Sequence, residues 1–191
     1  MKNIKIRIEG TTPLIMNAFT DQAAASASSG TRGSVVGDRG TPNEIAQSKV
    51  YRDNDGDACI PSPNLFRAII DAGKFFKNGK SKVTTIKSSI IPACLSLEGV
   101  TVRLEHKQGW KVDTRPVRIP STGGRILAHR PMFDDWALEF EVELDETMMS
   151  AKFLREIVDA AGSRIGLGDF RPDCKGMFGK FVVTKWEPMA A

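Results

Sequence analysis

Apolar and polar residues alternate strictly in two segments of the chain. Ile4, Ile6 and Ile8 alternate with charged residues near the amino terminus. From Trp136 to Leu144 every second residue is apolar, and the positions between them hold Ala137, Glu139, Glu141 and Glu143. A period of two places alternate side chains on opposite faces of a strand. Each segment therefore predicts a half-buried β-strand, and the glutamates are expected on its solvated face.

Two other segments have the apolar spacing of amphipathic helices. The first is expected to begin with Ser62 as its N-cap and a proline in its first turn, and to extend to about Phe76. The second is expected from about Ser150 to Ala161, with Gly162 as its C-cap. In both helices the leucine, isoleucine and phenylalanine positions define one face that would pack against a sheet.

Shorter apolar segments at 88–99, 100–105 and 181–186 predict further strands, and a hairpin is expected to turn at Asp55–Gly56. The main elements then follow the order strand, helix, strand, strand, helix, strand. This order predicts an α+β fold, a ferredoxin-like (RRM-like) βαββαβ palm. Residues 1–191 are expected to form a single domain with two insertions. One insertion, 11–61, contains a long flexible loop over Ala18–Glu44, and the other, 107–133, contains a protruding β-hairpin.

Charge is unevenly distributed along the chain, whose formal net charge is only +4. Residues 74–87 hold five lysines and no acid, and residues 111–131 hold five lysines and arginines against a single aspartate. Residues 134–146 hold seven acids and no base. This segregation predicts electrically different faces, of which the basic ones suit a polyanion.

The cysteines at 59, 94 and 174 are far apart, and only two histidines, His106 and His129, accompany them. That spacing matches no zinc motif, so we expect no metal and no cofactor. Unpaired thiols are typical of a cytoplasmic protein. The alternating start of the chain does not resemble a signal peptide, and no stretch is long and apolar enough to predict a membrane partner.

Basic residues gather in the predicted hairpin and in the glycine-rich segment Gly162–Phe181. Repeated positive charge along a surface is what phosphate binding requires. Glycines let backbone N–H groups face phosphate oxygens, and Phe170 and Phe178 offer rings for base stacking. The alternative for this segment is a tight turn that packs closely on the rest of the chain. The candidate RNA-binding residues are Arg32, Arg39, Arg52, Arg67, Lys74, Arg115, Arg118, Arg125, His129, Arg130, Arg164, Gly166, Gly168, Arg171, Lys175, Gly176 and Lys180.

The segment "GSRIGLGDFRPDCKGMFGKF" after the second helix resembles the glycine-rich loop of the RAMP superfamily, the ferredoxin-like proteins of CRISPR systems. The wider layout is similar to the backbone subunits that coat guide RNA in class 1 CRISPR effector complexes. The resemblance implies that residues 112–131 form a thumb, that Ala18–Glu44 lies near RNA or a neighbouring subunit, and that the helix beginning at Ser62 belongs to the RNA-facing palm. It also implies a helical homo-oligomer along the RNA, in contact with other effector subunits.

We therefore expect a non-catalytic, sequence-independent protein that binds single-stranded guide RNA and oligomerises along it. One alternative is a phage protein that binds single-stranded nucleic acid or mimics a CRISPR backbone subunit. The other is a metal-dependent ribonuclease that uses Asp21 or Asp38 in the long loop.

Overall fold

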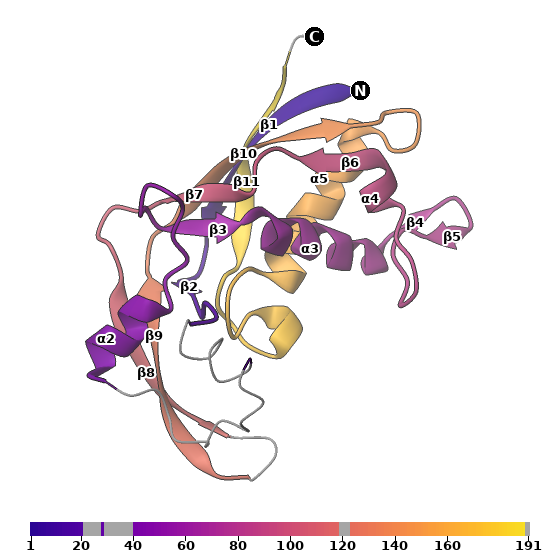
Figure 1. Ribbon diagram of the computed structural model, residues 1–191. Coiled ribbons are helices and arrows are strands. Elements are labelled where there is room, and N and C mark those ends of the chain that lie inside the picture. The colour runs from indigo at the N-terminus through magenta and orange to yellow at the C-terminus, as the bar shows by residue number, and fades with distance from the viewer. Residues whose placement is uncertain (21–27, 29–39, 119–122, 190–191) are drawn as a thin grey trace.

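The computed structural model describes residues 1–20, 28, 40–118 and 123–189, and its main element is an antiparallel sheet backed by helices (Figure 1). The long N-terminal strand β1 lies between the C-terminal strand β11 and the strand β10. In order across the sheet, the strands are β11 (Phe181–Pro188), β1 (Lys2–Gly10), β10 (Ala137–Leu144), β7 (Thr101–Glu105) and β3 (Cys59–Pro61), with β6 (Leu95–Leu97) also paired to β10. The α+β architecture expected from the sequence is therefore present.

The alternating patterns at β1 and β10 are confirmed. Ile4, Ile6 and Ile8 are fully buried in the core. The charged residues between them lie on the other face of the sheet, where Lys5 pairs with Glu139 at 2.6 Å. The glutamates of β10 thus belong to the charged face of a sheet, as their spacing predicts, and at least one of them is balanced by β1.

Two helices pack against the apolar face of this sheet, and both differ in their ends from the sequence prediction. Helix α3 (Ser62–Ala72) has Pro61 at its N-cap and continues into a 3-10 turn, Gly73–Phe75. The expectation that Ser62 caps α3 is wrong, because Ser62 lies inside the helix and its buried hydroxyl has no hydrogen-bond partner. The backbone N–H of Ser62 instead bonds the carbonyl of Val100.

Helix α5 (Ala151–Ala160) continues as a π-helical turn, Ala161–Ile165, so the expectation that Gly162 ends it is also wrong. The chain leaves the helix at Gly166, whose φ of 74° is one that glycine adopts without strain. Gly162 has a different role. A Cβ at this position would overlap the carbonyl oxygen of Phe181, so its missing side chain lets the helix approach β11 closely.

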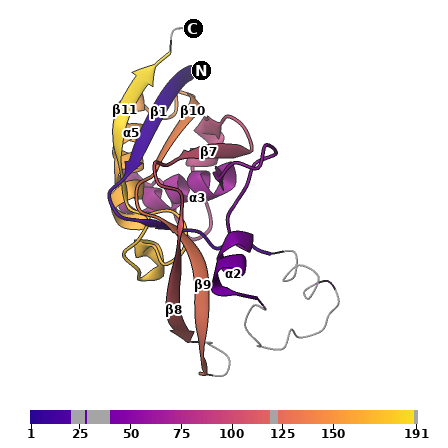
Figure 2. The same ribbon diagram turned by 90° about the vertical axis from the view of Figure 1, so that its left-hand side faces the viewer.

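A second sheet contains the basic hairpin, whose existence the sequence predicts correctly. Strands β8 (Lys111–Arg118) and β9 (Arg125–Phe133) pair along their whole length, and β2 (Leu14–Ile15) pairs with the base of β9. Figure 2 shows the hairpin projecting away from the main sheet. Helix α2 (Pro42–Ser48), whose first turn overlaps the end of the predicted loop Ala18–Glu44, packs against the hairpin.

The remaining connections are short. The predicted turn near Asp55 is present, because Arg52 and Ala58 form a bridge on either side of it. The strand expected over 88–99 is wrong in its first half, where a helical turn, α4 (Ile91–Cys94), precedes β6. Strands β4 (Lys77–Asn78) and β5 (Ser81–Lys82) form a small hairpin after α3. In the described part of the chain, no helix combines the length and the apolar character that crossing a membrane requires.

Candidate nucleic-acid interface

The glycine-rich loop, residues 166–180, lies between β2, the base of the hairpin and α3. Backbone amides of the loop donate to the segment after β1: Gly179 to the carbonyl of Pro13 at 2.8 Å, Asp169 to the carbonyl of Ile15 at 2.7 Å, and Lys180 to the Thr12 hydroxyl at 2.9 Å. The loop is therefore fixed to the body of the protein at several points.

The glycines of this loop face the protein's own chain. A Cβ at Gly168 would meet the carbonyl oxygen of Ile15, and one at Gly176 would meet the carbonyl oxygen of Phe170. The amides of Gly166 and Gly176 donate to the carbonyls of Ala161 and Arg171. The tight-packing alternative is thus confirmed, and these glycine amides are not available to cradle a phosphate. The side chains that the loop presents are therefore the better candidates for contact with a polyanion.

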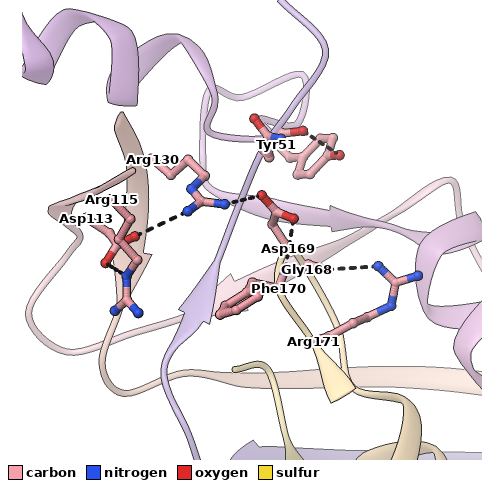
Figure 3. A network of polar contacts seen from close by, with 9 residues as sticks. Tyr51, Asp113, Arg115, Arg130, Gly168, Asp169, Phe170 and Arg171 are labelled. Carbon is pink, nitrogen blue, oxygen red and sulfur yellow. Dashed lines mark hydrogen bonds and ion pairs between the residues drawn. The ribbon is translucent and has the colours of Figure 1, made fainter. Parts of the chain in front are cut away.

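Arg130 connects the hairpin to the glycine-rich loop (Figure 3). Its guanidinium donates to the Asp169 carboxylate at 2.6 Å and lies 3.7 Å from that of Asp113 on β8. Asp113 in turn accepts a hydrogen bond from Arg115 at 2.7 Å. The side chain of Arg130 is only 7% exposed, because β9 enters the body of the protein at this point. Arg130 therefore serves to join two segments and is not placed to contact a phosphate on the surface.

Aromatic rings lie beside this network. Phe178 is buried, covered by the guanidinium of Arg115 at 4.6 Å from its ring centroid, so it cannot stack on a base as the sequence suggested. Phe170, tilted against Phe178, remains 40% exposed. Its φ of 51° is unusual for a bulky residue, a conformation that persists only where surrounding contacts hold it. Phe170 is the ring that this loop presents to solvent.

Two adjoining cavities border the loop. The hairpin pocket, about 410 Å³, lies between the loop and the hairpin and includes Leu127, Ala128 and Phe170. The helix pocket, about 270 Å³, lies between the loop and α3 and includes Arg67 and Arg171. Both pockets are also lined by Asn17 and Asp169, so the two pockets adjoin each other. Guanidinium groups and amide side chains thus line adjoining pockets.

The structure brings some predicted cations to these pockets and leaves others elsewhere. Arg67 lines the helix pocket while bonded to Asp71, and Arg171 lines it while donating to the carbonyl of Gly168 at 3.1 Å. Lys74 pairs with Asp173 of the loop at 2.8 Å, and Arg164 lies over the ring of Phe75. Exposed Lys175 and half-buried Lys180 flank the loop's end without lining either pocket.

The hairpin cations divide by their distance from the base of the hairpin. Arg118 and Arg125, both exposed, face each other at the end of the paired strands farthest from the body, and His129 shares a hydrogen bond with Thr114. Arg52 is on a separate turn, where it donates to the carbonyl of Gly56 at 2.7 Å. Arg32, Arg39, Asp21 and Asp38 lie outside the described residues.

Several residues that shape the site carry no motif in the sequence. Asn17, Tyr51 and Asn64 line the helix pocket from three separate segments, and Asp169 joins both pockets. Of these four residues, only Asp169 could have been singled out from the sequence, because it is an acid inside a basic, glycine-rich segment. In the described segments, no group of three His, Cys, Asp or Glu side chains converges in a way that could hold a metal ion.

No protein-family model and no curated protein matches the sequence. A solved structure does match the fold, a chain of the "Type III-B Cmr-beta bound to cognate target RNA" determined by cryo-electron microscopy. The TM-score is 0.62 at 11% identity, over 98% of this chain and 60% of that one. At so low an identity the likeness concerns the fold. This chain spans about 60% of the length of the chain it matches.

Proposed function

We propose that this protein is a non-catalytic RNA-binding subunit of the RAMP type, which oligomerises along a guide RNA as the backbone of a CRISPR ribonucleoprotein. The observation that carries the proposal is the pair of adjoining pockets that the hairpin, the glycine-rich loop and α3 line with basic and aromatic side chains. The strand order β11-β1-β10-β7 is that of a ferredoxin-like palm, which supports the same assignment. The RNA-bound state of the structural neighbour supports an RNA partner.

The side chains along the two pockets explain why binding would be independent of sequence. Arg171 and Arg67 line the helix pocket and would bind phosphates there, and phosphate contacts carry no sequence information. Phe170 would stack on a base beside them, an interaction that every base can make. Arg118 and Arg125 at the hairpin tip would reach a second position of the strand or a neighbouring subunit.

The test is a binding titration with fluorescently labelled single-stranded RNA at low and moderate salt. Replacing Phe170 by alanine is expected to weaken binding about tenfold, within the ~1–3 kcal/mol typical of base–aromatic stacking. Arg171→Gln is expected to weaken binding and to lower the slope of its salt dependence by about 0.7 for each phosphate that is no longer neutralised. Val182→Ala, at an exposed apolar position of β11, is the matched control and should leave affinity unchanged.

Three outcomes would overturn the proposal. One is a folded protein that ignores RNA at low salt, and another is tighter binding of DNA of the same sequence, which would favour the single-stranded DNA alternative. The third is magnesium-dependent cleavage of the RNA that is abolished by Asp21→Ala or Asp38→Ala. Light scattering with long RNA tests oligomerisation separately, because a backbone subunit must bind in several copies per strand.

A further inference from the structure

A lysine-rich arm follows α3 and takes no part in the site described above. The lysine arm, residues 77–89, contains β4, β5 and the loop that returns to the body. Lys77 lies directly opposite Lys82 in the β4–β5 pair. Like charges facing each other across an antiparallel pair are destabilising. The arrangement is therefore unfavourable in isolation and becomes favourable when an anion lies against it.

The charges of the arm lack partners, in contrast to those of the main sheet. On or beside the sheet, Lys2, Lys5, Arg7 and Arg103 each pair with an acid. Across the described residues, no ion pair or hydrogen bond of the ammonium groups is found for the arm's four lysines, Lys77, Lys80, Lys82 and Lys87, and all four are exposed. The nearest acid of α3, Asp71, already bonds Arg67.

A groove of about 860 Å³ separates the lysine arm from α3. Lys82 and Lys87 line it on the arm side, and Arg67 and Lys74 line it on the helix side. Hydroxyl groups of the arm complete the lining. Arg67 and Asp71 also line the helix pocket, so the groove adjoins that pocket on the opposite side from the hairpin pocket.

The arm is firmly attached, so its exposed charges can be changed without disturbing the fold. The buried Val83 donates to the carbonyl of Phe76 at 3.1 Å, and the hydroxyls of Thr84 and Ser89 share a hydrogen bond of 2.8 Å. Asn78 donates to the carbonyl of Met148. The side chains of Lys82 and Lys87, in contrast, make no hydrogen bond or ion pair within the described structure.

We propose that the groove between the lysine arm and α3 binds the phosphodiester backbone of the same RNA strand, where that strand leaves the helix pocket. This inference rests on the proposed function and extends its footprint. An extended polyanion fits because the three cavities adjoin one another in series and because the unpaired Lys82 and Lys87 line one wall of the last. A compact anion would occupy only one part of that series.

The test compares wild-type protein with Lys82→Gln/Lys87→Gln on labelled RNAs of about 5 and about 16 nucleotides, near the limits of common single-strand site sizes. The short RNA fits the helix and hairpin pockets alone, so its affinity should not change. Affinity for the long RNA should fall several-fold, and the slope of its salt dependence should fall by about 1.4 for two phosphate contacts. The control Lys107→Gln/Lys185→Gln removes the same charge outside the groove and should match the wild type.

Each result separates this inference from the proposed function. Equal affinity of the arm variant and the wild type for the long RNA, with Arg171→Gln still weakening both RNAs, would overturn the groove and leave the site intact. An equal loss on both RNA lengths, or in the control, would indicate a general charge effect and also overturn it. If the arm variant loses binding to a polyglutamate peptide while its RNA binding is unchanged, the groove binds an acidic protein instead of RNA.

Discussion

At the scale of single residues, burial decides which of the basic side chains can meet a ligand. Arg115, Arg125 and Arg130 all belong to the basic hairpin. Arg125 is exposed near the tip, Arg115 is held by Asp113 and Phe178, and Arg130 is enclosed between two aspartates. The position of each arginine along the hairpin therefore decides its role. Arg125 is exposed to solvent, Arg115 covers the ring of Phe178, and Arg130 joins the hairpin to the glycine-rich loop.

Replacing Arg130 by alanine is expected to destabilise the protein by about 2 kcal/mol, because Asp169 loses its partner at the join with the hairpin and the buried carboxylate of Asp113 keeps only Arg115. Urea unfolding followed by circular dichroism measures this. Arg125→Ala, at an exposed position of the same strand, serves as the control and should change stability by less than about 0.5 kcal/mol. Similar losses for both variants would contradict the structural role assigned to Arg130.

Glycine positions permit a similar comparison. Gly179 and Gly79 have nearly the same φ, 68° and 62°, but a Cβ at Gly179 would overlap the Leu167 carbonyl, whereas Gly79 is surrounded by open space. Gly79→Ala should cost about 1 kcal/mol from backbone strain alone. Gly179→Ala should lower the free energy of unfolding clearly more than Gly79→Ala does. The shift in the midpoint of urea unfolding measures the difference. Equal costs would mean that the loop relaxes readily around position 179.

At the scale of elements, helix α2 is started by a local capping motif and then packs against the hairpin. The sequence "TPNE" from Thr41 to Glu44 is a capping box with a first-turn proline. The hydroxyl of Thr41 accepts a hydrogen bond from the backbone amide of Glu44, and the Glu44 carboxylate accepts one of 2.8 Å from the backbone amide of Thr41. This local pattern indicates the helix, although the glycine-rich composition around it favours a loop.

The capping box predicts a pH dependence of helix α2. The backbone amide of Thr41 holds the pKa of Glu44 below its ordinary value of 4.5. Because that pKa is depressed on folding, its contribution is present above pH 4.5 and is lost as pH falls through the lower folded value. Hydrogen exchange in α2 should therefore lose protection in acid, and Glu44→Gln should remove this dependence while α3 stays protected. Unchanged behaviour in the variant would exclude the carboxylate as the cause.

At the scale of the whole molecule, the candidate interface exists only because distant segments converge. Its walls come from the segment after β1, the turn before β3, helix α3, the hairpin and the glycine-rich loop. Arg130 and Asp169, far apart in the sequence, hold two of these walls together. The groove beside the lysine arm adjoins the helix pocket through Arg67 and Asp71.

The reactivity of the cysteines can be used to follow the packing of the folded chain. Cys59 and Cys94 are buried, and burial raises the pKa of each thiol, whereas Cys174 is exposed in the glycine-rich loop. A thiol reagent should therefore modify one cysteine per native chain rapidly and the other two only as the protein unfolds. Mass spectrometry during a denaturant titration measures this. Rapid labelling of all three in the native protein would contradict the packing of β3 and α4.

Local patterns alone were enough for the strands β1 and β10, the cores of α3 and α5, and the basic hairpin. Alternation and helical spacing depend on which side of one element is buried, and the sequence records that directly. The ends of the helices could not be predicted as well from the sequence. Ser62 and Gly162 each match a cap motif, but one is inside a helix and the other allows close contact with β11.

The candidate site divides in the same way. The concentration of positive charge in the hairpin and the presence of a special glycine-rich segment were determined by the sequence itself. Only the tertiary structure decided that the loop's glycines pack inward, that Arg130 is buried against Asp169, and that Phe170 rather than Phe178 faces solvent. The physical reason is that burial and pairing depend on contacts between segments distant in the chain, which no local pattern encodes.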